Sequence, residues 1–276
     1  MNPRALAFLR ELIQRAFAQF HTPDTVCDAA LFPPVPQGYI ADSPGFSLPA
    51  SWRAAFPGTG GSAAPAGAQL QLVWDDKSRT VAPWALGPGN LPDSKYGDTV
   101  VSLAGKGALV LFDLGDFKLA AFAALAAAQA YFLSRLPPQA TRLEAVAGGV
   151  RPVDLVRCLP TEHRPLLENP VFLGAHERVA TRLIAVRMPE AVVNKRRRPA
   201  RRPAKQRGDT PSQAHLSLLA WHRFITNVPS TVWTPQTVCT AYALRGQVEL
   251  VFKSWKSHLH LATLRTKTAD STLWYL

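Results

Sequence analysis

A short, uninterrupted apolar run, Ala108–Phe112, places the strongest constraint on the fold of this chain. Strands that read as continuous apolar runs are typical of sheets buried on both faces, and such sheets are typical of α/β proteins. The run ends in Asp113, and Asp116 then occupies a position suited to a helix N-cap. An Ala-rich helix from Leu119 and a strand at Tyr131–Leu136 complete a strand–helix–strand unit. We therefore predict an α/β fold with Asp113 in the crevice where open α/β sheets bind ligands.

A second carboxylate follows a shorter strand nearer the N-terminus. The apolar residues Tyr39–Ala41 lead directly into Asp42, after which Ser43-Pro44-Gly45 breaks the chain. The same letters are good turn chemistry, so Asp42 either belongs to a site at a strand end or begins a turn. Residues 68–76 and 80–86 are predicted to pair as a hairpin, and its turn explains the Asp75-Asp76 pair better than a site does.

A helix with a strongly patterned surface is predicted from Thr240 to Leu261, opened by Thr234-Pro235. Spacings of three and four residues put five side chains on one face: Tyr242, Arg245, Glu249, Phe252 and Lys256. Glu249 lies one turn from Arg245 on one side and from Lys253 on the other. One interpretation is that neighbouring cations keep the Glu249 carboxylate ionised, so that it can bind a metal ion. The other is that the face forms only a row of ion pairs on the helix surface.

The charge of the chain indicates a polyanionic partner. There are 31 Lys and Arg residues against 19 Asp and Glu, a formal net charge of +12, which is typical of nucleic-acid binding. Eight of the basic residues lie in 195–207, where prolines predict an exposed, irregular arm. This arm is either a disordered basic segment or a contact to the DNA backbone through Lys195, Arg196, Arg197 and Arg198.

The region from 140 to 219 is predicted to be rich in β-structure. Short β-prone runs separated by Pro, Gly and charged residues occur at Arg142–Val146, Val153–Arg157, Val171–Leu173 and Val179–Val186. Residues Leu216–Val228 are expected to return as a further strand. At the other end of the chain, residues 1–21 read as an amphipathic helix.

The compartment is predicted from what the chain does not contain. Three scattered cysteines form no CxxC pair, no apolar run is long enough to span a membrane, and the N-terminus shows no export signal. We expect a cytoplasmic, nucleoid-associated protein that does not bind a membrane.

The spacing Tyr-x2-Arg-x3-Glu-x6-Lys resembles the signature of bacterial DDE transposases of the insertion-sequence-four type, with matches at Tyr242, Arg245, Glu249 and Lys256. Two upstream blocks are also similar to that family. The first is Asp42-Ser43 followed by Leu48-Pro49, Gly60-Gly61 and Leu70-Gln71-Leu72, and the second is Asp113 and Gly115 followed by a helix and a strand ending in Arg135. Four positions depart from the usual letters: Pro44, Leu114, Asp116 and Gly246. The resemblance covers residues 38–265, and family members are expected to extend further at both ends.

The resemblance implies a ribonuclease-H-like mixed sheet flanked by helices, with a β-rich insertion between the second Asp and the Glu. It divides the chain into an N-terminal helical segment (1–37), a first part of the catalytic core (38–139), the insertion (140–233) and a final core segment with the signature helix (234–276).

The same resemblance implies a metal-dependent active site formed by Asp42, Asp113 and Glu249. Three carboxylates would repel one another without a cation, and hard oxygen ligands favour two Mg²⁺ or Mn²⁺ ions. The implied reaction is strand cleavage at transposon ends, through a hairpin intermediate, and joining to target DNA. A homodimer would hold the inverted-repeat ends in a synaptic complex.

Several side chains would then contact DNA. On the signature helix these are Tyr242, Arg245, Lys253 and Lys256. Trp221 is the candidate for stacking on a flipped base, although a core tryptophan is the commoner case. Three other functions stay open at this point: a ribonuclease-H-fold nuclease that cuts without joining, an impaired or truncated transposase that still binds DNA, and a basic nucleic-acid-binding protein without an active site.

Overall fold

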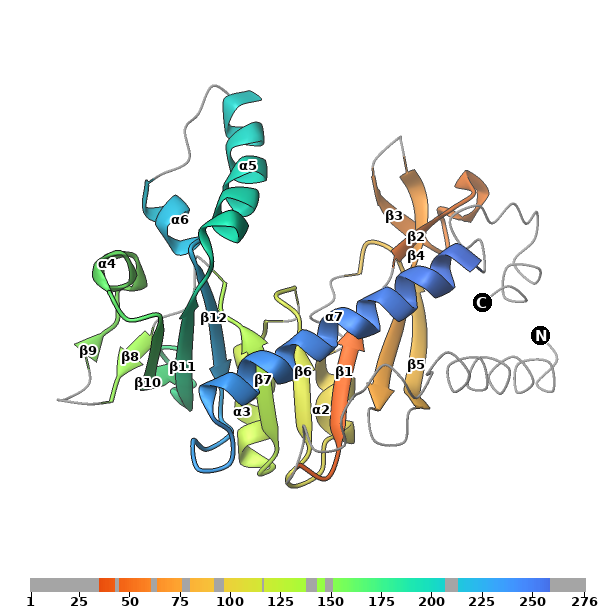
Figure 1. Ribbon diagram of the computed structural model, residues 1–276. Helices are drawn as coiled ribbons and strands as arrows, with labels where there is room; N and C mark the ends of the chain where they lie inside the picture. Colours follow the sequence, from red (N-terminus) through yellow and green to blue (C-terminus); the bar gives the residue numbers. More distant parts are fainter. Residues whose placement is uncertain are drawn as a thin grey trace. The chain divides into compact units, whose positions relative to one another are not determined.

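We analysed a computed structural model of the chain, which describes residues 35–42, 45–60, 64–75, 80–91, 97–115, 117–137, 143–146, 151–206 and 213–258. The fold is of the mixed α/β class, as predicted (Figure 1). The chain divides into two compact units. The first unit contains Met1–Asp116 and Cys239–Leu276, and the second contains Phe117–Val238. The four segments expected from the sequence stay a prediction.

The first unit contains a mixed sheet with the order β2-β4-β1-β6. Its strands are β1 (Gly38–Asp42), β2 (Gly45–Leu48), β3 (Pro57–Gly60), β4 (Ala64–Asp75), β5 (Thr80–Pro88) and β6 (Leu109–Phe112). Strands β1 and β6 are parallel, whereas β1, β2, β3 and β5 all pair with β4 in the antiparallel direction. The described helices of this unit are η2 (Ala50–Trp52), α2 (Gly97–Leu103) and most of α7 (Pro235–His258).

Strand β6 is fully buried. All four of its residues, from Leu109 to Phe112, are 0% exposed. This burial is what the continuous apolar run predicts, since an alternating strand would leave one face in water. The predicted hairpin is confirmed as well, because β4 and β5 pair along most of their length. Asp75, the last residue of β4, is buried and accepts a 2.7 Å hydrogen bond from the Gln37 side chain.

The second unit contains an antiparallel sheet with the order β7-β12-β11-β10-β8-β9. Its strands are β7 (Tyr131–Arg135), β8 (Leu143–Ala145), β9 (Arg151–Pro152), β10 (Leu166–Leu173), β11 (Val179–Arg187) and β12 (Trp221–Thr226). Its helices are α3 (Leu119–Ala127), α4 (Leu155–Thr161), α5 (Glu190–Gln206) and α6 (Gln213–Leu218). Helix α3 packs on β7 through Phe122, whose ring stacks on that of Phe132 with centroids 4.6 Å apart.

One predicted strand and one predicted cap are wrong, and the strand predicted at Leu216–Val228 is confirmed only from Trp221 to Thr226. Residues from Leu155 form helix α4 because Asp154 caps it, with Oδ1 accepting hydrogen bonds from the amides of Val156 at 3.0 Å and Arg157 at 3.2 Å. The region 216–228 contains the end of α6 before β12 begins. The N-cap of α3 is Lys118, which makes no side-chain capping bond; the predicted cap residue Asp116 lies outside the described residues.

The basic run was predicted to be irregular, and this prediction is wrong for its described residues 195–206, which continue helix α5 as far as Gln206. Pro199 and Pro203 each remove one backbone donor, and that loss is the reason for the wrong prediction. The remaining residues are mostly Ala, Arg, Lys and Gln, which favour helix, and Val193 in the first half of the helix is buried at 2% exposure. An anchored helix of good helix formers can therefore continue through both prolines.

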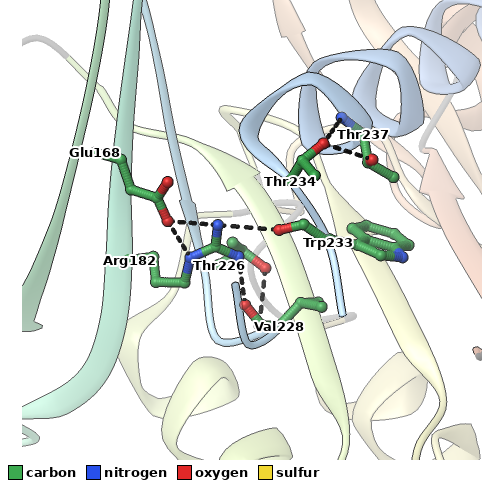
Figure 2. Close-up of polar contacts among 7 residues, drawn as sticks. All are labelled: Glu168, Arg182, Thr226, Val228, Trp233, Thr234 and Thr237. Atoms are coloured by element: carbon green, nitrogen blue, oxygen red, sulfur yellow. Dashed lines mark hydrogen bonds and ion pairs between the residues drawn. The ribbon is translucent and has the colours of Figure 1, made fainter. Parts of the chain in front are cut away.

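A partly buried arginine, Arg182, fixes the turn that precedes α7 (Figure 2). Arg182 on β11 donates hydrogen bonds to the carbonyls of Val228 at 2.6 Å and Trp233 at 3.0 Å, and its Nε donates to Glu168 at 2.7 Å. Thr234 then begins the helix, since its hydroxyl accepts a 3.2 Å hydrogen bond from the Thr237 amide. The predicted Thr234-Pro235 start of the helix is confirmed.

None of the helices in the part of the chain that the structure describes is long and apolar enough to cross a membrane.

Candidate active site

The two predicted strand-end aspartates follow neighbouring parallel strands of the first unit. Strand β1 pairs with β6 in the register Gly38↔Leu109, Tyr39↔Val110 and Ile40↔Leu111. When this register is continued by two residues, Asp42 comes to lie beside Asp113 in the backbone alignment. Because parallel strands end at the same edge of a sheet, the two residues share the carboxyl edge of the strand pair.

Helix α7 contacts this edge through two side chains of the signature face. Arg245 Nη2 lies 3.1 Å from Asp113 Oδ2, with the arginine side chain 7% exposed and that of the aspartate 38% exposed. One turn earlier, the Tyr242 hydroxyl donates a 3.4 Å hydrogen bond to the Phe112 carbonyl at the end of β6. The sequence predicted that Arg245 faces Glu249 or DNA, and its ion pair with Asp113 is an additional contact that the sequence did not reveal.

Glu249 follows Arg245 by four residues in the continuous helix α7, which is about one turn. Backbone geometry thus puts Glu249 on the same face as the residue that contacts Asp113. The side chains of Asp42, Glu249, Lys253 and Lys256 lie outside the described part of the structure. The convergence of the three carboxylates within metal-binding distance stays a prediction.

At the carboxyl edge of the β1–β6 pair, a carboxylate that can bind a hard cation lies beside the guanidinium group of Arg245. No group of three metal-ligating side chains occurs among the side chains that the structure describes, of which Asp113 is the only member of the predicted triad. Within the same set, Arg245 Nη2 at Asp113 Oδ2 is the single polar contact of the Asp113 side chain, and the carboxylate is partly open to solvent. Asp113 therefore has capacity for a further ligand.

Trp221, the predicted base-stacking residue, is the first residue of β12 and is 4% exposed. The guanidinium carbon of Arg187 lies 5.9 Å from the centroid of its ring, within the range of a cation–π contact. A base that stacked on this face would have to replace Arg187. The stacking role stays a prediction.

The four predicted DNA contacts of the basic run lie on helix α5 and differ in exposure. Lys195 and Arg198 are exposed. Arg196 contacts the Nε2 atom of His222, and Arg197 donates a 3.3 Å hydrogen bond from Nε to the Leu216 carbonyl. Of the four, only Lys195 and Arg198 are thus exposed to solvent without a described contact to the protein.

A cationic cluster in the second unit was not singled out by the sequence analysis. It consists of Arg135 at the end of β7, Arg196 on α5 and His222 on β12, whereas Arg223, the next residue of β12, projects from the opposite face of the strand. The one signal in the sequence is the His222-Arg223 pair inside an otherwise apolar strand. That signal could not be interpreted alone, because the other two members are remote along the chain.

Comparisons with known proteins agree with the signature. The family described as Transposase DDE domain matches residues 33–273. The transposase for insertion sequence element IS231B from Bacillus thuringiensis subsp. berliner is 27% identical over 79% of this chain and 49% of its own length. That for IS231F from Bacillus thuringiensis subsp. israelensis is 25% identical over 96% of this chain and 59% of its own length. That for IS1151 from Clostridium perfringens is 26% identical over 79% of this chain and 49% of its own length.

The chain therefore spans about half the length of the curated relatives that it matches. Among solved structures, a piggyBac transposase synaptic complex with hairpin DNA aligns with 86% of this chain and 44% of that chain, at a TM-score of 0.45 and 10% identity. The match of the family profile over most of the chain, together with the signature residues on α7 at the end of β6, places this chain in the Transposase DDE domain family.

Proposed function

We propose that this chain carries the active site of a DNA transposase, which cleaves strands at the ends of an insertion sequence and joins them to target DNA. The observation that carries the proposal is the contact of Arg245, a signature residue, with Asp113, the second predicted carboxylate, at 3.1 Å. This ion pair holds the signature helix against the strand end where the β1–β6 register also sets Asp42.

We propose Asp42, Asp113 and Glu249 as ligands of two divalent cations, Mg²⁺ or Mn²⁺. The fit rests on the donor set, because carboxylate oxygens at adjoining strand ends are what these hard cations prefer. When bound, such a pair supplies an activated water and stabilises the leaving oxygen of a phosphodiester. In fold terms, the proposal makes the first unit ribonuclease-H-like and residues 140–233 an insertion into it.

The remaining residues of the edge position these ligands. Arg245 is almost fully buried and pairs with one oxygen of Asp113, so it limits the rotation of that carboxylate. Tyr242 ties the helix to the β6 backbone and so fixes the height of α7 along the strand. Lys253 and Lys256, further along α7, are proposed contacts to DNA phosphates, since lysines bind phosphate oxygens and share this helix with the proposed ligand Glu249. A homodimer that binds two transposon ends follows from the same proposal.

The test compares Glu249→Gln with the unmodified chain on a plasmid bearing the inverted repeats that flank its gene. We expect Mg²⁺- or Mn²⁺-dependent nicking by the unmodified chain and loss of nicking in the variant and after chelation of the metal. DNA binding and the midpoint of thermal unfolding should stay nearly unchanged, because the substitution preserves side-chain volume and helix propensity.

Two outcomes would redirect the proposal. Nicking that survives Glu249→Gln shows that Glu249 is not a ligand and only belongs to an ion-pair ladder. Nicked product without joined product, for the unmodified chain, favours a nuclease that cuts without joining. Arg245→Ala serves as the graded comparison, since loss of a positioning residue should reduce nicking less than loss of a ligand.

A further inference from the structure

The turn between β12 and α7 is closed by one side chain from another strand (Figure 2). From β11, Arg182 donates through Nη1 to the Val228 carbonyl at 2.6 Å and through Nη2 to the Trp233 carbonyl at 3.0 Å. These carbonyls lie near the two ends of the turn, and both residues are almost fully buried, at 0% and 1% exposure. Because a guanidinium group is planar and rigid, it fixes the distance and the direction between the two carbonyls.

The flanks of the turn are held by other contacts. At the β12 end, Oδ1 of Asn227 accepts a 2.8 Å hydrogen bond from the Phe132 amide on β7. At the α7 end, the Thr234 hydroxyl accepts a 3.2 Å hydrogen bond from the Thr237 amide and so caps the helix. Arg182 therefore connects two ends that are already ordered. What it adds is the direction in which α7 leaves the turn.

The charge of Arg182 does not require these two carbonyls. Its Nε donates to Glu168 on β10 at 2.7 Å, and its Nη2 lies 2.5 Å from the same carboxylate oxygen. A lysine at this position could form the same ion pair, since only a positive charge is needed for it. The planar fork of an arginine is needed for the two ends of the turn, and the turn leads directly into α7.

Helix α7 continues from this fixed start to the proposed active site. Its buried side contains Val238, Ala241 and Leu244, which recur every three residues on one face. The next residue, Arg245, reaches Asp113 at 3.1 Å. With side chains, a helix has a radius of about 5–6 Å, so that a rotation of about 20° around its axis moves a side-chain tip by about 2 Å. A shift of that size would break the contact between the two charges.

We propose that Arg182 is a positioning residue of the transposase reaction: by holding both ends of the turn, it sets the axial rotation of α7 that brings Arg245 to Asp113. The inference rests on the proposed function, because that function makes the position of Arg245 matter for catalysis. The described contacts of Arg182 are to the turn and to Glu168, so it acts through the helix and not on the reacting atoms.

The decisive variant is Arg182→Lys, which keeps the charge beside Glu168 and removes the planar fork. A single ammonium group cannot hold both carbonyls in fixed directions. We expect kcat for Mg²⁺-dependent plasmid nicking to fall about 10–100-fold, as for a misplacement of about 1 Å at a reacting centre, while KM for the plasmid stays nearly unchanged. Measured well below the unfolding midpoint, a loss of stability alone would change neither constant.

Two controls separate positioning from charge and from stability. Glu168→Gln removes the ion pair but keeps both carbonyl bonds, and it should nick like the unmodified chain. Leu159→Ala removes a side chain of 1% exposure from α4, which packs on α6, and so lowers stability without changing the turn. Its kcat should also be retained. An equal loss of kcat in Leu159→Ala and Arg182→Lys would show a general effect of stability and overturn the positioning role.

A double-mutant cycle of Arg245→Met and Asp113→Asn, followed by urea unfolding, needs neither DNA nor metal. In the unmodified chain we expect a coupling of about tenfold in the unfolding equilibrium constant, as for side chains in contact. In the Arg182→Lys background the coupling should disappear, because Arg245 no longer reaches Asp113. Coupling that persists in that background overturns the inference, and so does absence of coupling in the unmodified chain.

A second variant covers the case in which Arg182→Lys does not fold. The double variant of Arg182→Gln and Glu168→Gln is neutral at both positions and also lacks the fork, so it replaces the lysine variant in both measurements. Its control is Glu168→Gln alone. Absence of nicking by the unmodified chain rejects the proposed function, whereas the coupling measurement still decides whether Arg182 positions Arg245.

Discussion

At the scale of single residues, the buried arginines Arg245 and Arg223 and the partly buried Arg182 differ in their partners. Arg245 pairs with the carboxylate of Asp113 at the proposed active site. Arg182 binds two backbone carbonyls and Glu168 and so fixes a turn. Arg223 has buried donors that no described group accepts. Their partners distinguish Arg245, which is proposed to position the Asp113 carboxylate, from Arg182, which holds the backbone of a turn, and Arg223 shows that burial alone assigns neither role.

Arg182→Met should be strongly destabilising. The change leaves the carbonyls of Val228 and Trp233 without their donor and removes the cation beside Glu168 (Figure 2). We expect the free energy of unfolding to fall by about 2–4 kcal/mol, from the loss of buried hydrogen bonds and of the charge partner. Urea denaturation followed by tryptophan fluorescence measures this difference.

Glu168→Gln is the control for that measurement, because it removes the ion pair but keeps both carbonyl bonds of Arg182. Its effect should be within about 1 kcal/mol, as for a partly exposed ion pair. Equal losses in the two variants would show that the carbonyl bonds contribute nothing, contrary to the role assigned here.

At the scale of elements, the sequence predicts those whose pattern is local. The apolar run Ala108–Phe112 predicts the buried strand β6, the apolar residues before Asp42 predict β1, and helical spacing after Thr234-Pro235 predicts α7. Helix α4 was missed because β-prone residues follow a capping aspartate, and the cap determined the structure. The Arg245–Asp113 contact and the cationic cluster could not be predicted, since each joins residues remote along the chain that no spacing relates.

Helix α5 offers a test of the corrected structure of the basic run. Pro199→Ala restores a backbone donor in the middle of the helix, where a proline costs about 3 kcal/mol relative to alanine in an isolated helix. We expect stronger helical circular dichroism and slower amide exchange in residues 195–206. Pro189→Ala is the matched control, because Pro189 precedes the helix and its missing donor is not needed there. No change in exchange for Pro199→Ala would favour the irregular arm that the sequence suggested.

At the scale of the whole molecule, a net charge of +12 predicts that the proposed DNA binding depends on salt wherever the cations lie. Whether the charges on helix α5 contribute to this binding more than charges elsewhere can nevertheless be tested. Neutralising the exposed pair Lys195 and Arg198 on α5 to Gln should make the slope of log K against log salt shallower by about 1.8, for two lost phosphate contacts.

The control for this prediction is the double variant Arg151→Gln and Arg157→Gln, which removes the same charge from exposed positions on β9 and α4. Its slope should stay near that of the unmodified chain. Equal slopes for the two double variants would show that net charge alone, and not the face of α5, governs binding.

The parallel register of β1 and β6 determines which changes in chain length this protein can accept during evolution. Asp42 and Asp113 are 71 positions apart, yet their alignment depends only on the pairing of Gly38 with Leu109 and the residues that follow. Insertions in the loops between the two strands can lengthen the gene without moving either carboxylate. A single codon lost inside β1 would instead turn every later side chain of that strand to the opposite face. Lineages of this family should therefore vary in loop length and hold the length of this strand constant.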